Sequence, residues 1–375
     1  MTASYKTMVV KIGSSTVVGS DGTVDRRFIG DLARQASELN ALGWRLVVVS
    51  SGAIACGYPL LGFGVKPVGD LPSLQACASA GQCIISAAYD EEFRARDLLT
   101  SLVLLTRHDT ARRSSYLHAR DALLKLVELG VVPIVNENDT VTVDEIKFGD
   151  NDTLAALVSC LVGADLCVTL SDIDGLYTAN PHEDPSAEFI PRVDKIDARI
   201  IGSAGDSSTA VGTGGMITKI RASRILMTAG ISSVICSGEE PDALVRLAQG
   251  RSVGTLFAPP ADRLEIAPRK LWIALGDSAH GSVTVDDGAA RALVDNGSSL
   301  LSVGIKAVEG PFAAGDVLDV LDGNGMVIAR GIAEADSCVL ELAAGRRQDE
   351  IAANRLLSDL GEKPAIHRDN LIVFA

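Results

Sequence analysis

The chain has 375 residues, of which 47% are hydrophobic and 22% charged, and its formal net charge at pH 7 is −14. This length is typical of two domains, and the acidic balance argues against nucleic acid or an anionic membrane as the main partner. No stretch approaches the roughly 18 unbroken apolar residues of a membrane span, and the first residues lack a signal-peptide pattern. We therefore expect a cytoplasmic protein with no membrane contact.

From Lys6 to about Phe257, short apolar β-rich runs alternate with helical patterns. The runs are nearly continuous rather than alternating, which is typical of a parallel sheet covered on both faces. We predict strands at residues 7–13, 44–53, 101–106, 131–135, 166–173 and 232–236, and helices at 26–43, 72–96, 114–129, 152–163 and 215–229. Residues 1–260 are thus predicted to form a three-layer α/β/α sandwich with a mainly parallel sheet.

The pattern changes near Pro259 and Pro260, where the segment PPADRLEIAPRK carries three prolines. Beyond this linker come short β-type runs with Gly and Asp turn signals, a spacing that favours a small β-barrel-like domain. The segment RRQDEIAANRLLSDLG then has a helical pattern. We predict that residues 261–375 comprise the linker, the β domain and a helical tail.

Small or polar residues follow four of the predicted strands, in VVKIGSS, VVVSSGAI, VNEND and LSDIDG. Ligands of doubly wound sheets bind at the carboxyl ends of the strands, so four such loops predict a site there. In KIGSS, Lys11 stands before a glycine that lets backbone N–H groups approach a phosphate. An ordinary glycine turn with a solvated Lys11 is the alternative interpretation.

The loop GTGGMITK, residues 212–219, places three glycines before a helix that begins near Met216. Glycine-rich backbone at a helix N-terminus favours an anion, although a flexible loop has the same composition. Neither G-x-x-x-x-G-K-[ST] nor a G-x-G-x-x-G after the first strand is present. These loops indicate phosphoryl transfer that relies on Lys11, Lys219 and backbone amides.

None of the five histidines falls in these loops. A carboxylate acceptor is already ionised at pH 7 and needs no general base, whereas a hydroxyl acceptor benefits from one. The pattern therefore favours a carboxylate or phosphate acceptor. Residues 136–152, NENDTVTVDEIKFGDND, concentrate amides and carboxylates, which suit turns and helix caps, a metal site or a pocket for a cationic group.

The motifs VVKIGSS, VVVSSGAIACG, VVPIVNENDTV, IKFGDNDTLAA, LSDIDGLYTANP and GTGGMITKIRA, in this order, resemble the amino acid kinase family. Residues from about 269 to 347 resemble a PUA domain. NEND followed by GDND and GTGGM-x-TK resembles one branch of this family, and that resemblance implies transfer of a phosphoryl group from ATP, with Mg²⁺, to the γ-carboxylate of L-glutamate, the first step of proline synthesis. Another carboxylate or phosphate acceptor within the family is the alternative.

The resemblance also implies the roles of individual residues. Catalytic roles fall to Lys11, Lys219 and Asp152, with Asp152 organising the lysines and no metal-ligating residue assigned. Glutamate binding falls to Ser51, Gly52, Asn136, Asp139 and Asn151. ATP binding falls to Lys11, Gly13, Ser14, Ser171, Asp172, Thr213, Gly214, Gly215, Met216, Ile217, Thr218 and Lys219. The middle of the acidic stretch, including Asp144 and Glu145, is interpreted as a loop that covers the substrate.

The family further implies feedback inhibition by proline, a homodimer or homotetramer, and a glutamyl-phosphate reductase partner. PUA domains often bind RNA, but from Pro268 onward the chain has ten Lys and Arg against sixteen Asp and Glu. A nucleic-acid surface usually shows a basic stripe. RNA binding is therefore not expected as the main role.

Overall fold

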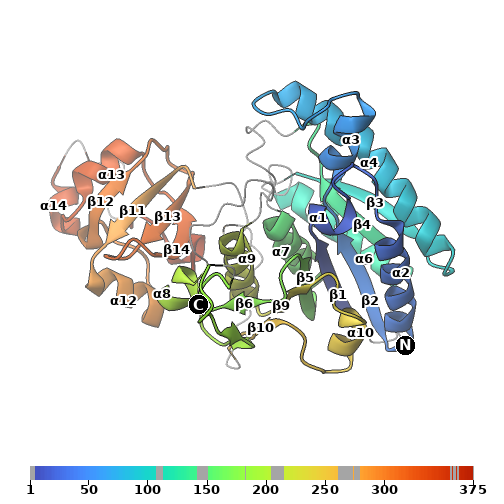
Figure 1. Cartoon of the computed structure of the whole chain (residues 1–375). Coiled ribbons are helices and arrows are strands. Elements are labelled where there is room, and N and C mark those ends of the chain that lie inside the picture. The colour runs from blue at the N-terminus through green and yellow to red at the C-terminus, as the bar shows by residue number, and fades with distance from the viewer. Residues whose placement is uncertain are drawn as a thin grey trace. The chain divides into compact units, whose positions relative to one another are not determined.

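The computed structural model describes residues 5–106, 113–141, 151–181, 183–203, 215–260, 273, 279–354, 357, 360 and 363–374. The chain forms two compact units, Met1–Asp262 and Arg263–Ala375 (Figure 1). No helix within the described ranges is long and apolar enough to cross a membrane.

An eight-stranded sheet is the centre of the first unit, in the order β3-β4-β2-β1-β5-β9-β10-β8. The strands are β1 (Lys6–Ile12), β2 (Trp44–Val49), β3 (Thr100–Leu105), β4 (Val132–Glu137), β5 (Leu166–Ser171), β8 (Arg192–Val193), β9 (Ser232–Ser237) and β10 (Thr255–Phe257). β3, β4, β2, β1, β5 and β9 are mutually parallel, and β10 is antiparallel to β9. The carboxyl ends of six strands therefore meet at one edge, with β1 at the point where the strand order reverses.

Helices cover both faces of this sheet, so the predicted three-layer sandwich is confirmed. The helices are α1 (Ser14–Val17), α2 (Arg26–Ala41), α3 (Ala53–Leu60), α4 (Leu71–Arg94), α6 (Arg113–Glu128), α7 (Asn151–Val162), α8 (Ala198–Gly202), α9 (Met216–Ala229) and α10 (Ala243–Ala248), and a hairpin joins β6 (Leu176–Tyr177) to β7 (Phe189–Ile190). α2, α4 and α10 share one core with the sheet, while α6, α7 and α9 contact its other face.

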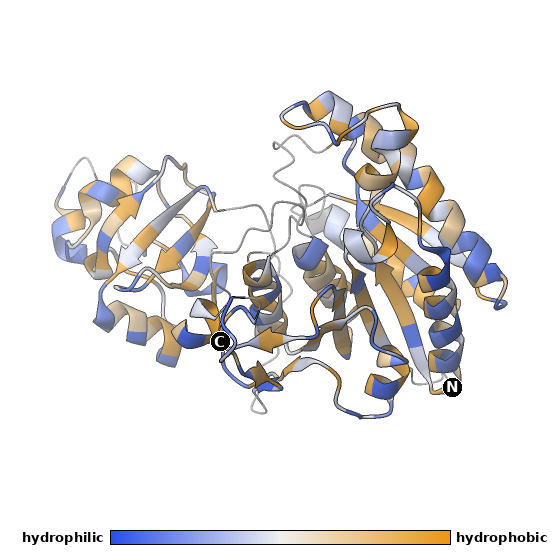
Figure 2. Cartoon of the chain, viewed as in Figure 1, coloured by the Kyte–Doolittle hydropathy of each residue, from blue (hydrophilic) through white to orange (hydrophobic). Residues whose placement is uncertain are grey.

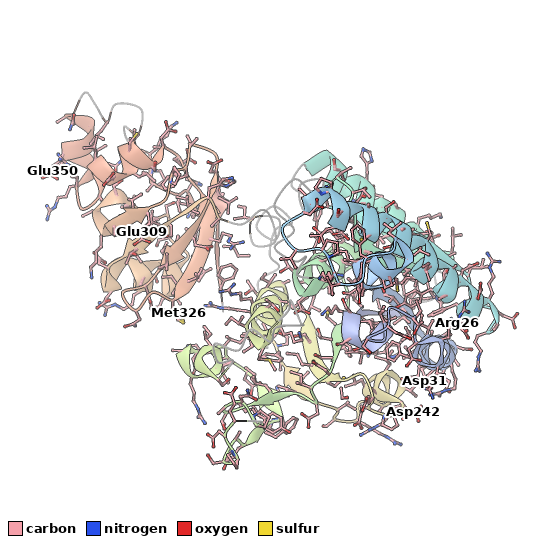
Figure 3. The ribbon with its side chains drawn as sticks, turned by 45° about the horizontal axis from the view of Figure 1, so that its top comes forward. Arg26, Asp31, Asp242, Glu309, Met326 and Glu350 are labelled. Atoms are coloured by element: carbon pink, nitrogen blue, oxygen red, sulfur yellow. The ribbon has the colours of Figure 1, made fainter. Side chains whose placement is uncertain are left out.

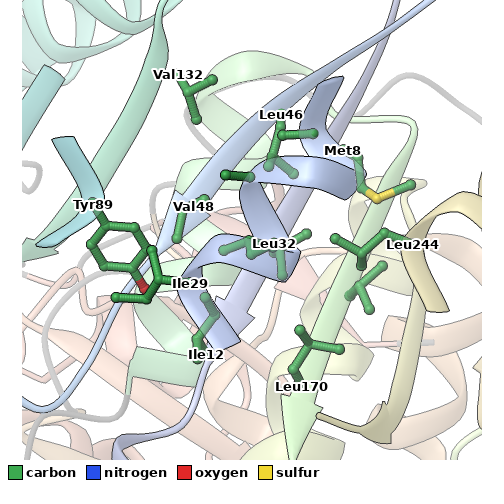
Figure 4. Packing of buried hydrophobic residues seen from close by; sticks show 14 of the residues in the cluster. Met8, Ile12, Ile29, Leu32, Leu46, Val48, Tyr89, Val132, Leu170 and Leu244 are labelled. Carbon is green, nitrogen blue, oxygen red and sulfur yellow. The ribbon is translucent and has the colours of Figure 1, made fainter. Parts of the chain in front are cut away.

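The core under α2 follows from the two-residue period of the strands. Met8, Ile12 and Val48 lie in the same core cluster as Ile29 and Leu32 of α2 (Figure 4). The intervening strand residues are also fully buried, so strands that are apolar on both sides need helices on both sides. Figure 2 shows this contrast between hydrophobic strands and the hydrophilic outer side of α2.

The outer surface of α2 is joined to the start of α10 by charged side chains. Arg34 lies 2.6 Å from Asp31 and 2.5 Å from Asp242, and Figure 3 shows Asp31 and Asp242 close together beside Arg26. Pairs this exposed contribute little to stability. The apolar core, rather than this network, holds α2 against the sheet.

Two glycines allow α3 and α4 to make close backbone contact. A Cβ on Gly57 would lie 1.8 Å from the Cys77 carbonyl oxygen, and one on Gly81 would lie 1.8 Å from the Ala53 carbonyl oxygen. No larger residue fits at either position without moving a helix. The contact fixes the position of α4 along α3, and α3 follows directly from the loop after β2.

The second unit contains a five-stranded sheet in the order β12-β11-β13-β14-β15. Its strands are β11 (Gly281–Val285), β12 (Ile305–Glu309), β13 (Val317–Leu321), β14 (Val327–Ile332) and β15 (Leu371–Val373), and its helices are α12 (Asp287–Asn296), α13 (Ser337–Ala343) and α14 (Gln348–Ala352), with 3₁₀ turns η1 (Ser302–Gly304) and η3 (Arg368–Asn370). The helix α12 was not predicted. Asp286 caps it by accepting a hydrogen bond from the Ala289 N–H at 2.7 Å, a start signal that the surrounding turn residues obscured.

Candidate active site

Two buried lysines and one buried aspartate meet at the carboxyl edge of the sheet. The Nζ of Lys11, near the end of β1, lies 2.9 Å from Oδ1 of Asp152, and the Nζ of Lys219, in α9, lies 3.4 Å from Oδ2. The side chains are 8%, 5% and 1% exposed, respectively, for Lys11, Lys219 and Asp152. The sequence places these residues far apart, and the fold brings all three predicted catalytic residues together.

The charges in this cluster determine the state of Asp152. Burial disfavours the carboxylate, but the positive charges of Lys11 and Lys219 outweigh burial and hold the pKa of Asp152 below its ordinary value. The cluster thus contains two ammonium groups and one carboxylate. The surplus positive charge, in a site shielded from water, suits an anion.

Thr218 ties the start of α9 to the same carboxylate. Its hydroxyl lies 2.8 Å from Oδ2 of Asp152 and 2.8 Å from the Gly215 carbonyl oxygen. One hydroxyl proton serves these two acceptors. The contacts fix Lys219 relative to Asp152, and Gly215 is the N-cap residue of α9.

A second group of predicted residues forms a hydrogen-bonded network beside the lysines. The Nδ2 of Asn151 donates to the Ser50 carbonyl oxygen at 2.7 Å, to Oγ of Ser51 at 2.8 Å and to Oδ1 of Asn136 at 3.2 Å. Asn151 and Asp152 are the first two residues of α7. One helix start therefore supplies both the amide network and the lysine-binding carboxylate.

Asp139 lies beyond the end of β4 in a different environment. Burial and the neighbouring charge of Glu137 raise its pKa to about 7, and Lys66 acts in the opposite direction. A cavity of about 670 Å³ adjoins it, with described lining residues from α4, β3 and the end of β4 that include Gln82, Glu137 and Asn138. Among the described residues, no hydrogen bond joins Asp139 to Asn136 or Asn151, so the role of Asp139 in the site stays a prediction.

The loop after β2 requires glycine at position 52. Gly52 has φ of 97°, and a Cβ there would lie 2.7 Å from Cγ2 of Val18.

Gly13 lies between β1 and α1, where its N–H already donates to the Leu170 carbonyl oxygen at 3.3 Å. Ser14 is the exposed first residue of α1. The Ser14 N–H belongs to the first turn of α1, where backbone N–H groups have no acceptor within the helix.

The remaining predicted nucleotide residues lie on β5 and α9. Ser171 is buried at the end of β5, and its hydroxyl donates to the exposed Asp172 at 2.9 Å. Met216 and Ile217 are half-buried and contact the small core between α9 and the β6–β7 hairpin. Thr213, Gly214, Asp144 and Glu145 lie outside the described residues.

None of the sequence motifs includes Gln82, which accepts a hydrogen bond from Nδ2 of Asn136 at 2.7 Å. A signal was present, because Gln82 occupies a buried stripe of α4 with Cys77, Ala78, Gly81 and Ile85. A glutamine in such a stripe needs a polar partner.

Comparison with known proteins identifies the family of the chain. The model of the amino acid kinase family matches residues 6–237, and that of the PUA domain matches residues 281–354. The chain belongs to the amino acid kinase family. Among its curated relatives, the glutamate 5-kinase of Geobacter sp. (strain M21) is 44% identical over 368 residues, which cover 98% of this chain and 97% of the relative. The glutamate 5-kinase of Acidovorax ebreus (strain TPSY) is 45% identical over 370 residues, covering 98% and 96%.

Proposed function

We propose that this protein transfers the γ-phosphoryl group of ATP to the γ-carboxylate of L-glutamate, which is the first step of proline biosynthesis. The observation that carries the proposal is the buried Lys11–Asp152–Lys219 cluster, directly beside the Asn136–Asn151–Ser51 network. Relatives that match over nearly the whole length and carry the name glutamate 5-kinase support the choice of acceptor.

In this proposal the lysines lower the barrier by electrostatics. A carboxylate and a triphosphate repel each other, and the ammonium groups of Lys11 and Lys219 offset that repulsion where the two substrates meet. Preorganised charges in a water-poor site act more strongly than in water and need no rearrangement during the reaction. Asp152 holds both ammonium groups in place. No proton has to leave the acceptor, so the absence of a histidine from the motif loops is consistent with the chemistry.

The amide network and Asp139 recognise the amino acid. With Nδ2 of Asn151 turned to Ser50, Ser51 and Asn136, its Oδ1 is the atom left to accept from the α-ammonium. Asp139 supplies the opposite charge for that ammonium, which lowers the pKa of Asp139 when substrate binds. The acidic stretch thus binds an anionic substrate through the one cationic group of that substrate, the α-ammonium.

ATP lies along the carboxyl edge in this proposal, with Ser171 and the start of α9 as its neighbours. No cluster of three or more His, Cys, Asp or Glu within the described ranges could hold a metal ion, and Asp152 is engaged by the lysines. These residues fit a Mg²⁺ ion held chiefly by nucleotide phosphates and water. When bound, Mg²⁺ neutralises charge on the phosphates of ATP.

The product of this reaction is an acyl phosphate, which we propose passes to a glutamyl-phosphate reductase. Feedback inhibition by proline, a homodimer or homotetramer, and a cytoplasmic location complete the proposal. Its support is the full-length similarity to the curated relatives.

A coupled ADP-release assay tests the acceptor. We expect ATP turnover with L-glutamate that far exceeds turnover with L-aspartate, N-acetyl-L-glutamate or UMP, and a decrease when proline is added. Hydroxylamine added to the glutamate reaction would trap the acyl phosphate as a hydroxamate. Turnover with aspartate or UMP and none with glutamate would show that glutamate is not the acceptor.

A further inference from the structure

The amide network at the acceptor site does not end at Asn136. Nδ2 of Asn136 donates to Oε1 of Gln82 at 2.7 Å, and both side chains are buried. Gln82 lies on α4, more than fifty residues before Asn136 and outside every motif loop. Asn151, Asn136 and Gln82 thus form a row of three hydrogen-bonded amides that runs from the loop after β2 to α4.

The direction of each amide in this line is determined by its neighbour. The Ser50 carbonyl oxygen can only accept, so Asn151 must present Nδ2 to it. Asn136 must then present Oδ1 to Asn151. With Oδ1 of Asn136 facing Asn151, Nδ2 of Asn136 faces Gln82 and requires an acceptor there. Oε1 of Gln82 is that acceptor. The Ser50 carbonyl oxygen at one end and Oε1 of Gln82 at the other therefore hold the two asparagines in one orientation.

The position of Gln82 is itself rigid. It follows Gly81, whose close approach to the Ala53 carbonyl oxygen fixes α4 against α3. Gln82 is 8% exposed, lines the cavity next to Asp139, and its Nε2 has no hydrogen-bond partner within the described part of the chain. A buried donor without a partner destabilises the folded protein. Stability alone therefore does not account for a glutamine here.

We propose that Gln82 is a positioning residue of the acceptor site, which orients Asn136 and through it Asn151 so that Oδ1 of Asn151 accepts from the α-ammonium of the substrate. The inference rests on the proposed function, because it takes glutamate as the acceptor. Its effect is specific to the ammonium group. The γ-carboxylate, which lies toward Lys11 and Lys219, does not depend on Gln82.

Glutarate separates these two parts of the substrate, because it has both carboxylates of glutamate and no ammonium. The experiment measures the Kd of glutamate and of glutarate by calorimetry with a non-hydrolysable ATP analogue and Mg²⁺ present. Gln82→Met keeps the size of the side chain and removes the acceptor. We expect it to weaken glutamate binding about tenfold, as loss of one hydrogen bond to a charged group does, and to leave glutarate binding unchanged.

Two further variants complete the design. Gln82→Glu keeps an acceptor oxygen for Asn136 and should preserve more of the preference for glutamate than Gln82→Met. Gln35→Met is the matched control, since Gln35 is a buried glutamine of α2 whose Oε1 accepts from the Leu244 N–H at 3.0 Å, away from the site. Gln35→Met should lower thermal stability and leave the ratio of the two Kd values unchanged.

An independent measurement reports the orientation itself. The side-chain amide resonances of Asn136 and Asn151 should shift in Gln82→Met and remain near their wild-type positions in Gln35→Met. Equal weakening of glutamate and glutarate, or unshifted amide resonances, would overturn the positioning role. Failure of the proposed function has a different signature, namely no glutamate-dependent ADP release by the wild-type protein, and the amide resonances still test the role of Gln82 in that case.

Discussion

Lys11 and Asp152 form an ion pair of 2.9 Å between β1 and the start of α7, and both side chains are more than nine-tenths buried. Such a pair gains little net stability, because desolvation of two charges offsets their attraction. Lys219 joins the same carboxylate from α9. The arrangement is better explained by function, since one aspartate holds two cations at the edge where six strands end.

Replacing either lysine should reduce the rate more than substrate binding. We expect Lys11→Ala and Lys219→Ala each to lower kcat by about 10²–10³-fold, the usual effect of losing one preorganised charge contact, with a smaller change in the KM for glutamate. Steady-state ADP release measures both constants. Lys125→Ala is the control, because Lys125 pairs with Glu128 on the exposed surface of α6. A lysine variant that raised KM tenfold at normal kcat would refute the assignment.

Asp152→Asn should damage both stability and turnover. The change leaves the buried Lys11 and Lys219 without a counter-charge, and breaking a buried ion pair typically costs about 3–5 kcal/mol. Denaturant unfolding should show this loss, and kcat should decrease together with it. Asp319→Asn offers a comparison in the second unit, where Asp319 and Arg330 form a less buried pair. If Asp152→Asn were as stable and as active as the wild type, Asp152 would not organise the lysines.

The sequence predicted the layers of the first unit well, because strands that are apolar on both sides have few other solutions. The loop patterns also pointed to Lys11 and Lys219, because strand ends and helix starts carry ligand-binding residues in such folds, whereas Asp152 was implied only by the family resemblance. The resemblance implied different roles for Asn151 and Asp152, and the structure adds the contacts of each. Asp152 faces two lysines, while the adjacent Asn151 faces Ser51 and Asn136.

Other features depend on contacts that are remote in sequence and carry no local signal. Gln82 meets Asn136 from α4, a helix that Gly57 and Gly81 allow to pack closely against α3. The antiparallel β10 has three residues and cannot be separated from a loop by its composition. In the second unit, the capping signal of Asp286 lies among residues that also favour turns, so a helix was missed.

Asp139 should make glutamate binding depend on pH near neutrality. Burial and the charge of Glu137 raise its pKa to about 7, so the carboxyl is largely protonated at pH 6 and ionised at pH 8. Only the ionised form attracts the α-ammonium, and the KM for glutamate should therefore rise as the pH falls from 8 to 6. Asp139→Asn should raise the KM at pH 8 and remove most of this dependence. A wild-type KM that is constant from pH 6 to 8 would contradict the role.

The same pKa predicts a stability effect of opposite direction. Between pH 4 and 7 the folded protein holds the Asp139 proton more tightly than the unfolded chain does, so this residue lowers stability progressively as the pH rises. The full penalty is present above pH 7. Asp139→Asn should therefore stabilise the substrate-free protein at pH 8, by up to about 4 kcal/mol, and have little effect at pH 4. Urea unfolding at the two pH values measures the difference.

The glycine contact between α3 and α4 gives a prediction about the fold. An alanine within a helix is favoured over glycine by about 1 kcal/mol, but the added methyl of Gly81→Ala would lie 1.8 Å from the Ala53 carbonyl oxygen. Overpacking typically costs about 1–3 kcal/mol, and a contact this short with backbone belongs at the upper end. We expect Gly81→Ala to be destabilised and to bind glutamate more weakly, because a displaced α4 moves Gln82 away from Asn136. Gly64→Ala, which meets nothing within 4 Å and has no positive φ, should change neither property. Equal stability of the two variants would show that α3 and α4 can separate at little cost.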